Sequence, residues 1–244
     1  MKHSIHFSLV SFFLCFANVQ QTLATHLEKS SHSIQFGGAV NTGNSETTNL
    51  NTKLSSELQH GLWGYETSLE GQLNTARGVE SARSIRANGE VNYDFNEKTY
   101  AFGKGSINYD KFATYDFVVR EAIGLGWIIK QTPIQELSIE GGPGTSHRRI
   151  SGTNEFQNVP IANLSSKYIN HLSKTAEFKQ TFNADVSHQN THLESVSAIQ
   201  TKIIEQLALE ISFSVNHDSV IPPLSKNTRK TDTASKVTVV YMFK

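Results

Sequence analysis

The chain ends in a stretch, Thr231 to Lys244, that reads TDTASKVTVVYMFK and alternates between two kinds of side chain. Successive residues of a β-strand point to opposite faces, so a period of two residues predicts a strand. Lys236 falls on the more polar face, and the other face ends in aromatic residues: Val237, Val239, Tyr241 and Phe243. Aromatic side chains at the lipid–water boundary are typical of outer-membrane barrels, so we predict that this stretch closes such a barrel.

Length and composition are compatible with that prediction. The chain has 244 residues, 37% of them hydrophobic, and its 22 basic residues balance its 22 acidic residues. This balance gives no reason to expect nucleic acid as a partner. No run of about 18 apolar residues occurs beyond the N-terminus, which argues against a helical membrane protein. Low overall hydrophobicity still permits a barrel, because half of each barrel strand faces a polar interior.

Residues 1–24 are predicted to be a cleaved signal peptide. Lys2 supplies a positive start, residues 5–16 supply an apolar segment, and residues 22–24 place small side chains before a cleavage site. The alternative is a buried first helix, but a polar stretch follows the segment. We therefore expect export to the bacterial outer membrane, with residues 25–32 as a short N-terminal tail.

The single cysteine, Cys15, lies inside the predicted signal peptide. Leu14 precedes it, whereas a lipoprotein signal needs a small residue there, so we do not expect lipidation. The exported chain then contains no disulfide. A closed sheet in lipid would supply the stability instead, because all of its backbone groups are paired.

Beyond Ser33 the period is two residues almost everywhere, which predicts an all-β, transmembrane, antiparallel up-and-down barrel over residues 33–244. The predicted strands are longer than the five or six residues that are usual in soluble proteins, as about nine to eleven are needed to cross a membrane. We predict twelve strands, at 33–43, 47–60, 63–75, 81–95, 98–110, 115–130, 134–147, 157–172, 175–190, 193–205, 206–218 and 230–243.

The connections alternate in length, with tight turns after even-numbered strands. Longer loops are predicted after strands 3, 5, 7 and 11, at 76–80, 111–114, 148–156 and 219–229. Outer-membrane barrels have short periplasmic turns and longer outer loops, so this alternation agrees with an even strand count. The fifth strand is ambiguous in phase, because Tyr100 and Phe102 fall on the opposite face from Ile107 and Tyr109.

The polar faces of the predicted strands carry charges of both signs, which would lie in the lumen. They could form a hydrated pore whose charge rings set its selectivity, or pair across the lumen and close it. Twelve strands leave room for either arrangement. The strongest lumen candidates are Lys53, Glu70, Arg86, Glu90, Lys104, Arg120, Glu140, Lys202, Glu210 and Lys236; the same phase adds Glu57, Glu66, Glu136, Lys167, Lys179 and Glu194.

Two segments resemble one bacterial family. Residues 37–47 (GGAVNTGNSET) run from a strand into a tight turn, and residues 217–233 carry a DS…PP…TDT pattern before the closing strand. These motifs are similar to those of the domain-of-unknown-function 481 (DUF481) family of Gram-negative bacteria, described as salt-induced outer-membrane proteins. The turn residues that carry the resemblance are Thr42, Gly43, Asn44, Asp218, Pro222, Pro223, Thr231, Asp232 and Thr233.

The resemblance covers about residues 33–244. It implies an outer-membrane barrel and a role under salt or osmotic stress. It implies no reaction, because none is established for the family. One departure is Lys244, because barrel strands that are read by the assembly machinery usually end in an aromatic residue. Gly and Asn in the first motif tolerate positive φ in a tight hairpin, and two prolines in the second stiffen a loop.

Other functions were weighed against a barrel that acts as a narrow pore or stabilises the envelope. A rim-located lipid or lipopolysaccharide hydrolase would use Ser146 with His147, or Ser187 with His188. Such a dyad needs a nucleophile and a base within hydrogen-bond reach, and the chain has no nucleophile-elbow pattern. A third possibility is an adhesin or receptor that uses the loops at 148–156 and 219–229. We expect no enzyme, cofactor or metal site.

The expected partners follow from the membrane location. They are outer-membrane lipid, the β-barrel assembly machinery and lipopolysaccharide, whose phosphates could meet the basic side chains of the last loop. These basic residues are Lys226, Arg229 and Lys230. We expect a monomer that binds no nucleic acid.

Overall fold

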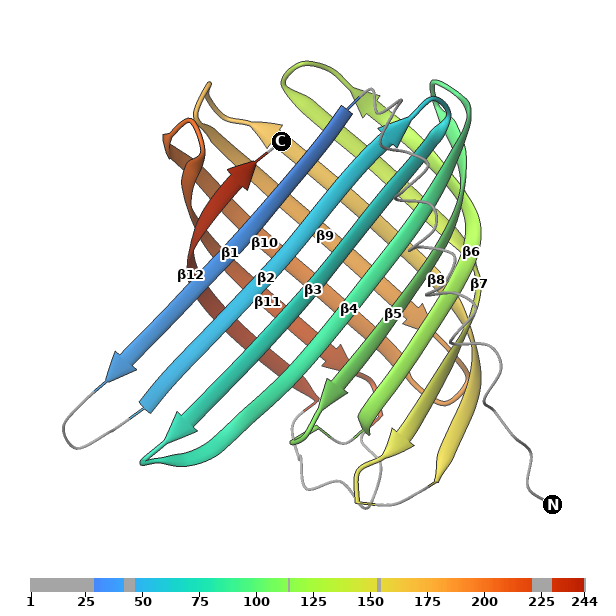
Figure 1. The fold of residues 1–244 in the computed structure, drawn as a ribbon. Helices are drawn as coiled ribbons and strands as arrows, with labels where there is room; N and C mark the ends of the chain where they lie inside the picture. The colour runs from blue at the N-terminus through green and yellow to red at the C-terminus, as the bar shows by residue number, and fades with distance from the viewer. Residues whose placement is uncertain (1–28, 42–46, 114, 153–154, 221–229, 244) are drawn as a thin grey trace.

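The computed structural model shows one closed β-barrel, in which every strand is antiparallel to both of its neighbours (Figure 1). The strands are β1 (Lys29–Asn41), β2 (Thr47–His60), β3 (Trp63–Ala76), β4 (Val79–Asn96), β5 (Thr99–Asp110), β6 (Tyr115–Gln131), β7 (Gln135–Ile150), β8 (Phe156–His171), β9 (Ala176–Val186), β10 (Thr191–Ile204), β11 (Leu207–Asp218) and β12 (Thr231–Phe243). The structure describes residues 29–41, 47–113, 115–152, 155–220 and 230–243.

This architecture confirms the predicted antiparallel barrel of twelve strands. Two strand ends differ by about four residues from the prediction. β1 begins at Lys29, inside the segment expected to be a tail, because it continues to pair with β2 as far as Gln59. β9 ends at Val186 because residues 187–190 form a turn, in which Ser187 N–H donates to the Asn190 carbonyl at 3.1 Å. The signal peptide predicted for residues 1–24 lies outside the described residues.

The two ends of the barrel differ in their connections (Figure 1). The turn end is where β1 begins and β12 ends, and it carries the connections after β2, β4, β6, β8 and β10. The loop end carries the connections after β1, β3, β5, β7, β9 and β11. Within the described residues, no helix is long and apolar enough to cross a bilayer.

One predicted loop is wrong. The connection expected over residues 76–80 is a two-residue turn of Arg77 and Gly78, with φ values of 51° and 74°. Positive φ at both central residues is the geometry that matches the twist of paired strands. Arginine rarely adopts positive φ, so of the two central residues only Gly78 is of a type that predicts this turn.

The outer face of the barrel is apolar. Large apolar side chains on this face are exposed, among them Ile123 (67%), Ile85 (53%) and Val237 (57%). A membrane around the barrel would cover them. At the turn end, the rings of Trp63 and Tyr93 lie 4.9 Å apart, and the ring of Tyr93 lies 5.7 Å from that of Phe95 on the same strand. Tyr241 and Phe243 stack at 6.1 Å within this girdle, as predicted from the closing strand.

The seam between β1 and β12 is short. Its register contains five residue pairs, from His32 opposite Phe243 to Phe36 opposite Val239. These pairs lie in the half of β1 that is next to the turn end. Among the described residues, positions 37–41 of β1 have partners in β2 but none in β12. The loop half of the seam therefore has unpaired strand edges.

The structure resolves the phase of the fifth strand. Tyr100 and Phe102 point inward and are buried, while Ile107 and Tyr109 point outward. Both inward rings lie over glycines of β6, where a Cβ on Gly124 would come within 2.8 Å of the Phe102 ring. The aromatic rings of β5 are therefore accommodated against the wall of β6.

Candidate functional site

The charged side chains of the lumen are the candidate functional site. Strand register places all ten charged lumen candidates at inward-facing positions. Nine of them are partly buried, whereas Lys202 is exposed at the turn end. In the strand register, Glu90 lies directly between Glu66 on β3 and Lys104 on β5.

The inward positions of the described strands carry more acidic than basic side chains. Among the residues whose side chains the structure describes, the nine basic ones are Lys53, Arg86, Lys104, Arg120, Arg148, Lys167, Lys179, Lys202 and Lys236. The fourteen acidic ones are Glu57, Glu66, Glu70, Glu90, Asp94, Asp110, Glu136, Glu140, Glu177, Asp185, Glu194, Glu210, Asp218 and Asp232.

Two ion pairs cross the lumen. Arg86 on β4 donates to Glu194 on β10 at 2.7 Å, and these strands are six positions apart in the ring of twelve. Lys167 on β8 lies 2.9 Å from Glu66 on β3, five strands away. We call these two contacts the cross-lumen braces. They connect walls of the barrel that have no backbone contact with each other.

The braces imply a flattened barrel. A circular barrel of twelve strands, spaced about 4.8 Å apart and tilted by about 40°, would measure roughly 24 Å between opposite backbones. An arginine and a glutamate in end-to-end contact span only about 15 Å between their Cα atoms. The Arg86–Glu194 contact therefore brings β4 and β10 closer together than a circular cross-section allows, and its side chains occupy the short axis.

Three further ion pairs follow the wall. Lys104 and Glu140 are 2.8 Å apart, and Ser165 and Tyr100 both donate to the same Glu140 carboxylate, at 2.7 and 2.9 Å. Arg120 lies 3.2 Å from the buried Asp185, and Lys53 lies 2.9 Å from Glu70. Charge-assisted bonds of this kind are stronger than neutral ones and hold the side chains in defined positions.

Besides Glu136 at the very start of β7, seven glutamates lie in the half of the lumen next to the turn end, and we call these seven the glutamate collar. Three of them take part in ion pairs, with Lys53, Lys104 and Lys167. Among the described side chains, the ion pairs of the lumen leave three other lysines in this half, Lys179, Lys202 and Lys236. The collar consists of Glu57, Glu66, Glu70, Glu90, Glu140, Glu177 and Glu210.

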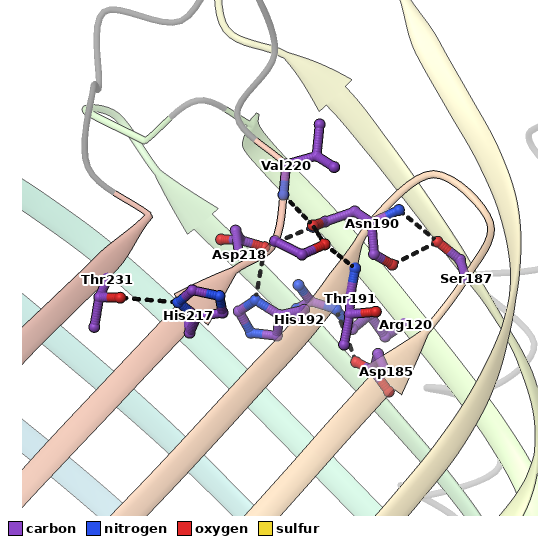
Figure 2. A network of polar contacts seen from close by, with 11 residues as sticks. Arg120, Asp185, Ser187, Asn190, Thr191, His192, His217, Asp218, Val220 and Thr231 are labelled. Carbon is purple, nitrogen blue, oxygen red and sulfur yellow. Dashed lines mark hydrogen bonds and ion pairs between the residues drawn. The ribbon is translucent and has the colours of Figure 1, made fainter.

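A polar network holds the loop end together (Figure 2). The Asn190 side chain donates to Asp218 at 2.7 Å and accepts from the Val220 N–H at 3.0 Å. His192 Nδ1 lies 3.0 Å from the same Asp218 carboxylate, and the Thr191 N–H donates to Ser219 Oγ at 2.8 Å. The turn between β9 and β10 is thereby attached to the start of the connection after β11.

The family-motif residues are divided between this network and parts of the chain outside the described residues. Asp218 accepts bonds at the end of β11, and Thr231 Oγ1 lies 2.8 Å from His217 Nδ1. Asp232 and Thr233 pair in register with β11. The other motif residues lie outside the described residues, as do two of the three basic residues of the last loop: Thr42, Gly43, Asn44, Pro222, Pro223, Lys226 and Arg229.

The geometry does not assemble the serine–histidine pairs considered for a hydrolase. Ser146 points inward and is buried, whereas its neighbour His147 points outward and lies 2.8 Å from Asn158. Ser187 donates its hydroxyl hydrogen to the Asn190 carbonyl at 2.7 Å, which uses it to close a turn. Neither serine therefore has a histidine base positioned to take its proton.

Asp185 is one of several charged lumen residues that sequence reasoning missed, together with Asp94, Asp110, Arg148 and Glu177. Asp185 is 5% exposed, and it accepts a hydrogen bond from Asn163 at 2.7 Å in addition to its contact with Arg120. The signal was present, because Phe182, Ala184 and Val186 form an outward face and leave Asp185 inward. Its partner Arg120 lies on β6, three strands away, and no pattern within one strand indicates such a contact.

Comparisons with known proteins agree with this architecture. A model of the family described as "Protein of unknown function, DUF481" matches residues 34–243. No curated protein matches the chain. Among solved structures, the fold is similar to the NanC porin (TM-score 0.56, 11% identity, covering 87% of this chain and 100% of that chain). It is also similar to the COG4313 outer membrane channel from Pseudomonas putida F1 (TM-score 0.50, 8% identity, covering 88% and 95%). These likenesses show the fold of an outer-membrane barrel.

Proposed function

This chain belongs to the DUF481 family, and we propose that it forms a narrow outer-membrane channel for small ions, held narrow by its cross-lumen braces. The observation that carries the proposal is the 2.7 Å contact between Arg86 and Glu194 on opposite walls. A lumen lined with charged side chains is hydrated and can conduct ions. A lumen crossed by ion pairs at two levels excludes larger solutes.

The side chains of the braces are partly exposed, which supports a hydrated channel and argues against a lumen closed by buried ion pairs. The Arg86 and Glu194 side chains expose 30% and 27% of their surface, and those of Lys167 and Glu66 expose 31% and 44%. Water therefore reaches both contacts. Ions that pass through such a lumen exchange part of their hydration shell for these charged groups.

The proposed orientation follows from the two ends of the barrel. Outer-membrane barrels place short turns in the periplasm and longer loops outside, so the turn end would be periplasmic and the loop end external. The aromatic girdle at the turn end would then mark the inner boundary of the membrane. Cleavage of residues 1–24, insertion by the β-barrel assembly machinery, contact with lipopolysaccharide and a monomeric state belong to the same proposal.

Currents across planar bilayers, together with swelling of liposomes in sugars of increasing size, test the channel. The protein is purified from the outer-membrane fraction of cells that express the full chain. We expect small single-channel currents and exclusion of disaccharides. Absence of current at every salt concentration would identify a purely structural barrel. Rapid entry of trisaccharides would show that the lumen is wide.

A role under osmotic stress is supported by the family resemblance alone. A strain that lacks the gene, shifted to high salt, should grow more slowly than the parent strain. Complementation with the full chain should restore growth. Equal growth of all strains across the range of salt concentrations would argue against this role while leaving the channel untouched.

A further inference from the structure

The lumen carries an excess of negative charge, and we infer that the channel favours cations over anions. The inference rests on the proposed channel and concerns what passes through it. Among the side chains that the structure describes, fourteen acidic and nine basic ones occupy inward positions of the strands. Rings of carboxylates in a pore favour cations, because the field of fixed charges is focused by the low-dielectric wall.

Ion pairing does not remove this excess. Each of the five lumen ion pairs neutralises one base and one acid, so the surplus of acids remains. Glu57, Glu90 and Glu210 form no ion pair with any described residue. They come from β2, β4 and β11, which lie within one half of the ring of strands, so their carboxylates line the same side of the lumen. An ion that crosses the glutamate collar therefore passes carboxylates that have no ion-pair partner among the described residues.

The arginines of the loop half do not offset the collar, because each is already engaged. Arg86 and Arg120 are bound to carboxylates on other strands, at 2.7 and 3.2 Å. Arg148 donates to Gln189 at 2.9 Å, and its guanidinium group lies 4.6 Å from the centre of the Tyr115 ring. A passing anion would have to compete with these partners for the guanidinium groups.

A second observation near the collar points to cations. Thr238 is 6% exposed, faces inward, and lies opposite Glu210 in register. Its Oγ1 has no hydrogen-bond partner among the described residues. Hydroxyl and carboxylate oxygens are the ligand type that hard cations prefer. The Glu210 carboxylate and the Thr238 hydroxyl thus come from directly opposite positions, and the hydroxyl oxygen makes no hydrogen bond to any described residue.

The test is the reversal potential of the full-length protein in a planar bilayer across a tenfold KCl gradient. We expect the sign that corresponds to potassium permeating faster than chloride. A triple variant (Glu57→Gln, Glu90→Gln and Glu210→Gln) should shift the permeability ratio toward one, because three carboxylates that form no ion pair are removed. Lys236→Gln should shift it in the opposite direction. These two opposite shifts distinguish a charge effect from a general disturbance of the barrel.

Glu121→Gln is the matched control, because Glu121 is exposed on the outward face of β6. It should leave the reversal potential unchanged. Current with a reversal potential at zero, or with the sign of chloride selectivity, overturns the cation preference and leaves the channel standing. Absence of current in the wild-type protein overturns the channel and the cation preference together.

Discussion

Tyr100 lies flat against the backbone of Gly126 on the neighbouring strand. A Cβ on Gly126 would come within 2.2 Å of Tyr100 Cζ, so this glycine provides the space for the ring. The ring position allows the Tyr100 hydroxyl to donate to Glu140 at 2.9 Å, and Glu140 also accepts from Lys104. A glycine on the wall therefore determines where a lumen carboxylate is held.

Gly126→Ala should destabilise the barrel, because the added methyl group displaces the Tyr100 ring. Overpacking of this kind costs about 1–3 kcal/mol. The urea midpoint of unfolding, followed by tryptophan fluorescence in lipid vesicles, measures the loss. The matched control is Gly103→Ala, where the nearest atom to an added Cβ is 4.0 Å away. Equal midpoints for both variants would show that the Tyr100 ring moves aside without cost.

The loop-end network predicts an order of effects at Asn190. Asn190→Ala removes the bonds to Asp218, Ser219 and the Val220 N–H, so amide hydrogen exchange should become faster at Ser219 and Val220. Asn190→Asp should have a larger effect at neutral pH, because it places a second carboxylate beside Asp218. If exchange stays as slow as in the wild type in both variants, the attachment of this connection depends on other contacts.

The short seam predicts uneven protection along β1. Residues 32–36 have strand partners on both sides, whereas residues 37–41 have partners only in β2. In a strand with one free edge, alternate amides lack a strand acceptor. Hydrogen exchange in lipid vesicles should therefore be faster for alternate amides of 37–41. Uniform protection from 32 to 41 would show that β1 and β12 pair along their whole length in the membrane.

The ion pairs of the lumen predict how conductance depends on salt. The Debye length is about 10 Å at 0.1 M and about 3 Å at 1 M, and partly buried pairs are screened less than exposed ones. Contacts between 2.7 and 3.2 Å therefore persist in KCl up to about 1 M. Conductance divided by bulk conductivity should stay constant or fall as salt rises. A ratio that rises with salt would mean that salt opens the channel.

Much of the fold was predictable from the chain because barrel strands carry a local signal. Alternation along β12 and β11 predicted two opposite faces, and the structure places these residues on the outer and inner sides of the barrel wall. Alternation did not predict the orientation of β5, because the aromatic residues Tyr100 and Phe102 face inward. Their position depends on the glycines of β6, so it is a property of two strands together.

The sequence predicted most of the charged residues that line the lumen, but it did not predict which of them form ion pairs with one another. Period-two alternation placed Arg86 and Glu194 in the lumen, yet 108 positions of sequence separate them. Their contact depends on the flattening of the barrel, which results from the lengths and packing of many side chains. Alternation within single strands carries no information about the distance between opposite walls.

The single-channel conductance of the wild-type protein, compared with that of Arg86→Gln and Glu194→Gln, tests the narrow, braced channel most directly. Each variant removes the same 2.7 Å contact from the short axis of the barrel. Both should conduct more than the wild type and admit larger polymers, because the side chains that cross the lumen are released. Wild-type conductance and wild-type polymer exclusion in both variants would contradict the account, since the Arg86–Glu194 contact would then not limit the channel.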